Sequence, residues 1–134
     1  MDGFYLSVTP LYAGIFALIY IALAARVILQ RYSVRVGLGT GDDPTLLHRV
    51  RAHGNFAEYV PFCLLLLAMA EINGLSATLL HAAGLLLLIG RLAHVWGLSR
   101  TDGASVPRAF GMIVTFGVLL SVGLYLIAGS LLVT

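Results

Sequence analysis

The sequence has no lysine, a single cysteine and few charged residues of either sign. Charged residues make up 10% of the chain, against about 25% in a soluble domain. Together with a mean hydropathy of +0.98, this excludes an ordinary soluble domain and indicates an integral membrane protein. The lone Cys63 excludes an intrachain disulfide and a cysteine metal site. All basic residues are arginine, which suits a partly buried anion better than lysine does.

Four apolar segments are long enough to cross a hydrocarbon layer about 30 Å thick. We expect an all-α membrane protein in one domain, residues 1–134, whose four transmembrane helices run antiparallel. The expected spans are about 6–29, 44–72, 77–98 and 108–133. The polar stretches at 30–44 and 99–107 are typical of loops. In D-D-P-T, Asp43 is expected to cap the second helix and Pro44 to open it.

Every arginine lies in or near the two predicted loops at 30–44 and 99–107. The positive-inside rule therefore predicts that both loops are cytoplasmic and that both termini lie on the opposite side. The membrane we expect is a bacterial inner membrane. Nucleic acid is not an expected partner, because no basic run lies on a soluble surface.

The second span opens with groups that a bilayer rejects: H-R-V-R-A-H-G-N-F-A-E-Y-V-P, residues 48–61. Helical spacing places five polar residues on one flank, namely His48, Arg51, Asn55, Glu58 and Tyr59. Glu58 lies roughly 20 Å along the axis from the helix start, where a lone carboxylate costs at least ~2.5 kcal/mol. We therefore expect Glu58 to be buried among cations. In the third span, G-R-L-A-H places Arg91 and His94 on one flank, and an antiparallel arrangement brings Arg91 toward the depth of Arg51 and Asn55.

This side of the protein carries more cations than carboxylates, and an anionic ligand held by arginine would remove the imbalance. Several alternatives remain open. The buried charge could be an ion pair that only sets helix register. A metal site is disfavoured by the excess of arginine and by the spacing of His48 and His53. A proton relay through Glu58, His94 and Tyr59 would suit a small proton-coupled transporter, although no inverted repeat is present. A trimeric protein could also bind an anionic amphiphile without turnover.

A family resemblance narrows these alternatives. The segments R-A-H-G-N-F-A-E-Y-V-P-F, G-R-L-A-H and the P-R that opens the fourth span resemble the MAPEG family, membrane-associated proteins in eicosanoid and glutathione metabolism. The resemblance implies a left-handed four-helix bundle, assembled as a homotrimer, with glutathione between subunits as co-substrate. It implies a membrane-bound glutathione-dependent transferase or peroxidase that acts on hydrophobic electrophiles. The implied partners are glutathione, a hydrophobic small molecule or lipid substrate, membrane lipid and further copies of the chain.

The resemblance also implies roles for individual residues. Arg108 matches the arginine that holds the glutathione thiolate, although it would also serve as an interfacial anchor. The residues that match glutathione ligands are Arg26, Arg51, Asn55, Glu58, Tyr59, Arg91 and His94. Two positions depart from the pattern of several members: Leu98 stands where they have tyrosine, and Gly54 where some have a basic residue.

Two features outside the polar cluster carry further expectations. Glu71 ends the second span, and we expect it to have a surface role at the far interface. The fourth span contains Gly111, Gly117, Gly123 and Gly129, whose spacing of six predicts close packing on several sides of that helix.

Overall fold

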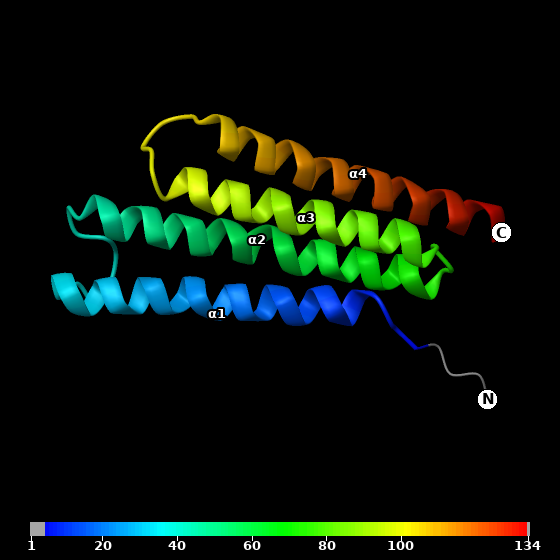
Figure 1. Cartoon of the computed structure of the whole chain (residues 1–134), viewed down its shortest axis with the longest axis horizontal. Helices are drawn as coiled ribbons and strands as arrows, with labels where there is room; N and C mark the ends of the chain where they lie inside the picture. The colour runs from blue at the N-terminus through cyan, green and yellow to red at the C-terminus, as the bar shows by residue number, and fades with distance from the viewer. Residues whose placement is uncertain (1–4, 134) are drawn as a thin grey trace.

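The computed structural model describes residues 5–133, and they form four long helices without a strand. The helices are α1 (Thr9–Val34), α2 (Pro44–Ile72), α3 (Ala77–Leu98) and α4 (Val106–Val133). They run side by side in alternating directions, and α1 begins at the same end where α4 ends (Figure 1). Helices α2 and α3 lie between α1 and α4, which do not contact each other.

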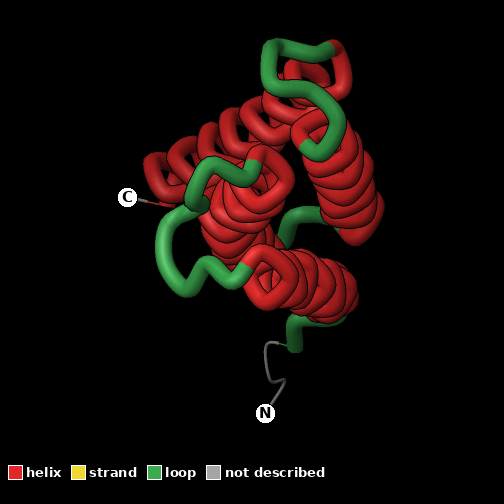
Figure 2. Tube along the Cα trace, turned by 90° about the vertical axis from the view of Figure 1, so that its left-hand side faces the viewer, coloured by secondary structure: helices red, strands yellow, loops and turns green. Residues whose placement is uncertain are grey.

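All four helices are long and apolar enough to cross a membrane, and the protein is an integral membrane protein with four spans. Loops 35–43 and 99–105 lie together at one end, which we call the arginine-rich end. Figure 2 shows both loops from that end, in front of the helices that they join. The short turn at 73–76 joins α2 to α3 at the opposite end (Figure 1).

Helix α1 continues farther than the sequence predicted. The expected span 6–29 is in fact a helix over Thr9–Val34, so the predicted loop was wrong at residues 30–34. The polar side chains there find partners while the helix continues: Gln30 Nε2 donates to Asp43 Oδ1 at 3.1 Å, and Arg31 Nη1 donates to the Gly39 carbonyl at 2.8 Å. Helix α4 begins at Val106, two residues before the expected Arg108.

The start of α1 is held by Glu71, at the end of α2. Its Oε1 accepts the backbone N–H groups of Ser7 at 2.6 Å and Val8 at 2.8 Å, and its Oε2 accepts that of Thr9 at 2.8 Å. Val8, the residue before the helix, has no side-chain cap of its own. Glu71 therefore supplies the acceptors that a capping residue normally provides. The expected surface role was too narrow, because this carboxylate ties the first two helices together.

The core is built around one stripe of α2. Five buried residues follow one another at steps of four and three: Phe56, Val60, Cys63, Leu67 and Ala70. This spacing keeps them on one side of the helix, which packs against the other three helices. Asp43 caps the start of α2 by accepting from the Leu46 N–H, and the helix continues through Pro61.

Helices α3 and α4 meet closely through glycine. A Cβ atom at Gly111 would overlap the Gly90 carbonyl oxygen, and one at Gly90 would lie 3.0 Å from Val114. Glycine is needed at position 111 because the backbone of α3 leaves no room for a Cβ there, and a Cβ at position 90 would require Val114 to shift. The other glycines of α4 do not have this role, since a Cβ at Gly117 or Gly123 would meet nothing within 4 Å. The prediction of close packing on several sides of α4 was therefore wrong.

Candidate functional site

The polar half of α2 is divided between two environments. Arg51 and Glu58 are exposed on the side of the helix that faces away from the other three helices, whereas Asn55 and Tyr59 are partly buried. The prediction that Glu58 is buried within the chain was therefore wrong. The reason is that α2 turns its apolar stripe into the core, which leaves Arg51 and Glu58 on the opposite side.

Arg91 is the largest fully buried side chain among the described residues, with 1% of its surface exposed. Its Cζ lies 5.7 Å from the centre of the Tyr59 ring, and its Nη2 lies 3.9 Å from the sulfur of Met112. Its Nε and Nη1 atoms are buried without an acceptor. Within residues 5–133 the one ion pair joins His48 to Asp102, so Arg91 lacks a carboxylate partner there. Such a cation costs several kcal/mol, and this indicates that an acceptor from outside the chain belongs here.

Buried polar atoms of Asn55 and His94 also lack a partner within residues 5–133. Asn55 Oδ1 and His94 Nε2 make no hydrogen bond within the described part of the chain. Asn55 lies one turn before Tyr59 on α2, and His94 lies one turn after Arg91 on α3. The other ring nitrogen of His94 lies 3.1 Å from the Arg108 carbonyl oxygen. Unsatisfied buried polar atoms are uncommon, so we call Asn55, Tyr59, Arg91 and His94 the inner polar cluster and treat it as a candidate ligand site.

Within the described chain, the side chains of Arg26 and Arg108 make no hydrogen bond to the inner polar cluster, although the Arg108 carbonyl contacts His94. Arg26 Nη2 lies 3.5 Å from Ser99 Oγ, beside a cavity of about 880 Å³ that Trp96 and Arg100 also line. Arg108 is turned to loop 99–105, where its Nη1 donates to the Gly103 carbonyl. The single cluster expected from the sequence is thus three groups in the folded chain: the inner polar cluster, the outward pair Arg51 and Glu58, and the arginines at the arginine-rich end.

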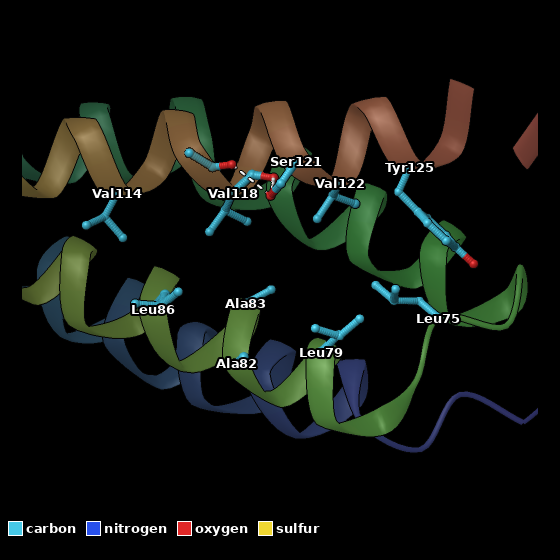
Figure 3. A pocket seen from close by; sticks show the side chains of 11 residues that line it. Leu75, Leu79, Ala82, Ala83, Leu86, Val114, Val118, Ser121, Val122 and Tyr125 are labelled. Atoms are coloured by element: carbon cyan, nitrogen blue, oxygen red, sulfur yellow. Dashed lines mark hydrogen bonds between the residues drawn. The ribbon is translucent and has the colours of Figure 1, made fainter. Parts of the chain in front are cut away.

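An apolar groove runs between α3 and α4 in the half of the bundle near the 73–76 turn (Figure 3). Its volume is about 470 Å³, within the range of small-molecule sites. The sequence analysis missed it, although small residues that face it on both helices are a possible signal. The lining residues are Leu75, Leu79, Ala82, Ala83, Leu86, Val114, Gly117, Val118, Ser121, Val122 and Tyr125. The groove suits the aliphatic part of a hydrophobic molecule.

The profile of the MAPEG family matches residues 9–128, which include nearly all of the four helices. The chain belongs to the MAPEG family. This confirms the resemblance carried by the motifs of α2 and α3, and with it the all-α four-helix fold. The MAPEG family includes glutathione transferases and peroxidases.

Two relatives of this MAPEG protein come from Escherichia coli. The inner membrane protein YecN of strain K12 is 37% identical over 90 residues, which cover 67% of this chain and 69% of the relative. YecN of strain O6:H1 (CFT073) matches with the same values. The name of these relatives states a location in the inner membrane and no reaction.

Proposed function

We propose that this MAPEG protein is a glutathione-dependent transferase or peroxidase that acts on hydrophobic electrophiles. Glutathione binds between subunits of a homotrimer, where the inner polar cluster of one chain faces charged residues of another. The observation that carries the proposal is Arg91, a fully buried cation whose Nε and Nη1 have no acceptor in the described chain.

The outward pair on α2, Arg51 and Glu58, supports a site that is shared with a second subunit. Arg51 and Glu58 are exposed in the single chain, yet both lie in a membrane-spanning helix. Leaving Glu58 against acyl chains would cost at least ~2.5 kcal/mol. A neighbouring subunit packed on this side of α2 removes the carboxylate from lipid and brings cations or donors to it. The site is therefore incomplete in one chain.

The chemistry of glutathione fits the groups that lack partners. Its two carboxylates suit guanidinium groups, for which Arg26, Arg51 and Arg91 are the candidates. Its ammonium group suits Glu58, and its amide N–H groups suit the unpaired Oδ1 of Asn55. Glutathione has one more negative than positive charge, so it would reduce the excess of positive charge that these groups carry.

Arg108 is the residue we assign to the glutathione sulfur. A guanidinium beside the thiol favours the thiolate, which is the reactive nucleophile. In the transferase reaction, the thiolate forms a carbon–sulfur bond while the electrophile loses its leaving group or opens its ring. In the peroxidase reaction, the thiolate attacks the hydroperoxide oxygen and releases the alcohol, and the resulting sulfenic acid reacts with a second glutathione to give the disulfide and water.

The hydrophobic partner would reach the site through the bilayer. The aliphatic groove between α3 and α4 (Figure 3) supports this part of the proposal, because it provides an apolar surface within the membrane-spanning region. The arginines in and beside loops 35–43 and 99–105 support a cytoplasmic placement of the arginine-rich end. The location of the YecN relatives supports an inner-membrane location for this chain.

A second candidate function is ligand binding without turnover. The observation that favours it is Leu98, which is 7% exposed at the end of α3 and provides an apolar side chain where several family members have a tyrosine hydroxyl. A protein of this kind would bind glutathione or another anionic amphiphile and release it unchanged.

A glutathione titration of the protein in lipid nanodiscs tests both candidates. We expect saturable binding, with the ultraviolet absorbance of the thiolate at neutral pH. Arg51→Ala should weaken binding, whereas Arg108→Ala should reduce the thiolate absorbance. Arg100→Ala is the matched control, because Arg100 is exposed and stacks on Trp96 at 4.8 Å. Binding without product from electrophiles or hydroperoxides supports the second candidate, and the absence of glutathione binding contradicts the first.

A further inference from the structure

A separate cavity of about 440 Å³ lies at the arginine-rich end of α1. It is lined by Ile28, Arg31, Tyr32, Arg35, Val36 and Gly37. The cavity forms where the chain reverses after the helix: Arg35 adopts a left-handed conformation with φ 56°, and the Val36 N–H donates to the Arg31 carbonyl at 3.1 Å. None of its residues belongs to the proposed glutathione site.

The cavity residues change in character along the helix axis. Ile28 and Tyr32 are four residues apart on one side of α1, and Arg35 follows directly after the helix. All three line the cavity and are exposed. They pass from aliphatic to aromatic to cationic toward the helix end. The same order occurs in a leaflet, from acyl chains through the interface, where tyrosine is enriched, to the headgroups.

The positive charge in this cavity is not neutralised by the chain. No carboxylate lines the cavity, and within residues 5–133 neither Arg31 nor Arg35 forms an ion pair. The guanidinium of Arg31 uses its Nη1 for the carbonyls of Gly39 and Val36. Because a guanidinium has five N–H donors, most of its capacity remains for an anion.

The loop beside the cavity also indicates contact with the bilayer surface. Leu38 has 92% of its surface exposed, the highest value among the large exposed hydrophobic residues in the described chain. A leucine at this position is shielded from water if the loop rests on the membrane. The cavity then opens at the depth of the lipid phosphates.

We propose that this cavity binds one anionic glycerophospholipid of the leaflet at the arginine-rich end. Arg31 and Arg35 hold its phosphate, Tyr32 lies at the level of the ester groups, and Ile28 lies along an acyl chain. The site adds a lipid requirement to the protein that is independent of glutathione.

Native mass spectrometry of the purified protein, with phosphatidylglycerol or phosphatidylcholine added, tests this site. We expect phosphatidylglycerol to be retained more strongly than phosphatidylcholine. Gly37→Leu should abolish the retained lipid by filling the cavity without a change in charge, because a Cβ there meets nothing within 4 Å. Arg35→Gln should weaken retention about fivefold, the effect of losing about 1 kcal/mol for one arginine near a membrane surface.

Matched controls separate a site from general attraction to charge. Gly103→Leu makes the same change in loop 99–105, where a Cβ also meets open space, and should leave the lipid bound. Arg100→Gln removes an exposed arginine at the same end and should have little effect. Full retention by Gly37→Leu, or equal losses in Arg35→Gln and Arg100→Gln, would overturn the proposal. Displacement of the lipid by an equal concentration of inorganic phosphate would also overturn it, because the site would then take soluble anions.

Discussion

Replacing Arg91 by methionine separates a ligand-binding role from a structural one, because the two roles predict opposite effects on stability. Arg91 is 1% exposed and has no carboxylate partner in the described chain. Burying such an ion costs several kcal/mol, whereas its position over the Tyr59 ring returns about 2 kcal/mol. Methionine keeps an unbranched side chain beside Met112 and removes the charge.

We therefore expect Arg91→Met to be more stable than the wild type by about 1–4 kcal/mol in the absence of ligand. Added glutathione should stabilise the wild type but not Arg91→Met. At about 100 times its Kd, a ligand stabilises the folded state by about 2.7 kcal/mol, and this gain should be present in the wild type and absent in Arg91→Met.

The assay is denaturant unfolding of the protein in mixed micelles, with and without glutathione. Arg100→Met is the matched control, and we expect it to respond to glutathione as the wild type does. A ligand-free Arg91→Met protein that is less stable than the wild type would contradict the reasoning, because the charge of Arg91 would then stabilise the protein without glutathione. A preserved glutathione response in Arg91→Met would contradict it as well.

Two further predictions concern the fold that positions the site. Glu71→Ala should lower the free energy of unfolding by about 1–2 kcal/mol because α1 loses its cap. Hydrogen exchange should then accelerate at the Ser7, Val8 and Thr9 amides. Unchanged exchange would show that the cap is dispensable. Gly111→Leu should cost about 1–3 kcal/mol because its side chain overlaps α3. Gly123→Leu, where a Cβ meets nothing within 4 Å and which lies outside the groove, should stay within about 0.5 kcal/mol. Similar unfolding curves for the two variants would argue against the close contact of α3 and α4.

The sequence predicted the four helices because apolar length alone decides which segments can cross a bilayer. It misplaced the end of α1, since Gln30 and Arg31 looked like loop residues. Their partners, Asp43 and the Gly39 carbonyl, lie beyond the chain reversal, and the polarity of residues 30–34 did not reveal them. The cap that Glu71 provides joins residues more than 60 positions apart, so local sequence signals could not predict it.

The sequence named candidate site residues but did not predict which of them the fold brings together. The position of Arg91 along its span follows from counting along the helix, and its side chain is buried in the folded chain. The direction of each side chain depends on which stripe of α2 enters the core. The buried stripe from Phe56 to Ala70, with its steps of four and three, was a readable signal that Glu58 lies on the opposite side of the helix.

Native mass spectrometry of the protein released from nanodiscs containing glutathione tests most directly whether the ligand site is shared between subunits. We expect glutathione to remain bound to trimers and to be absent from monomers, since one chain provides only part of the site. Equal retention of glutathione by monomers, or trimers that carry none, would contradict a glutathione site between subunits.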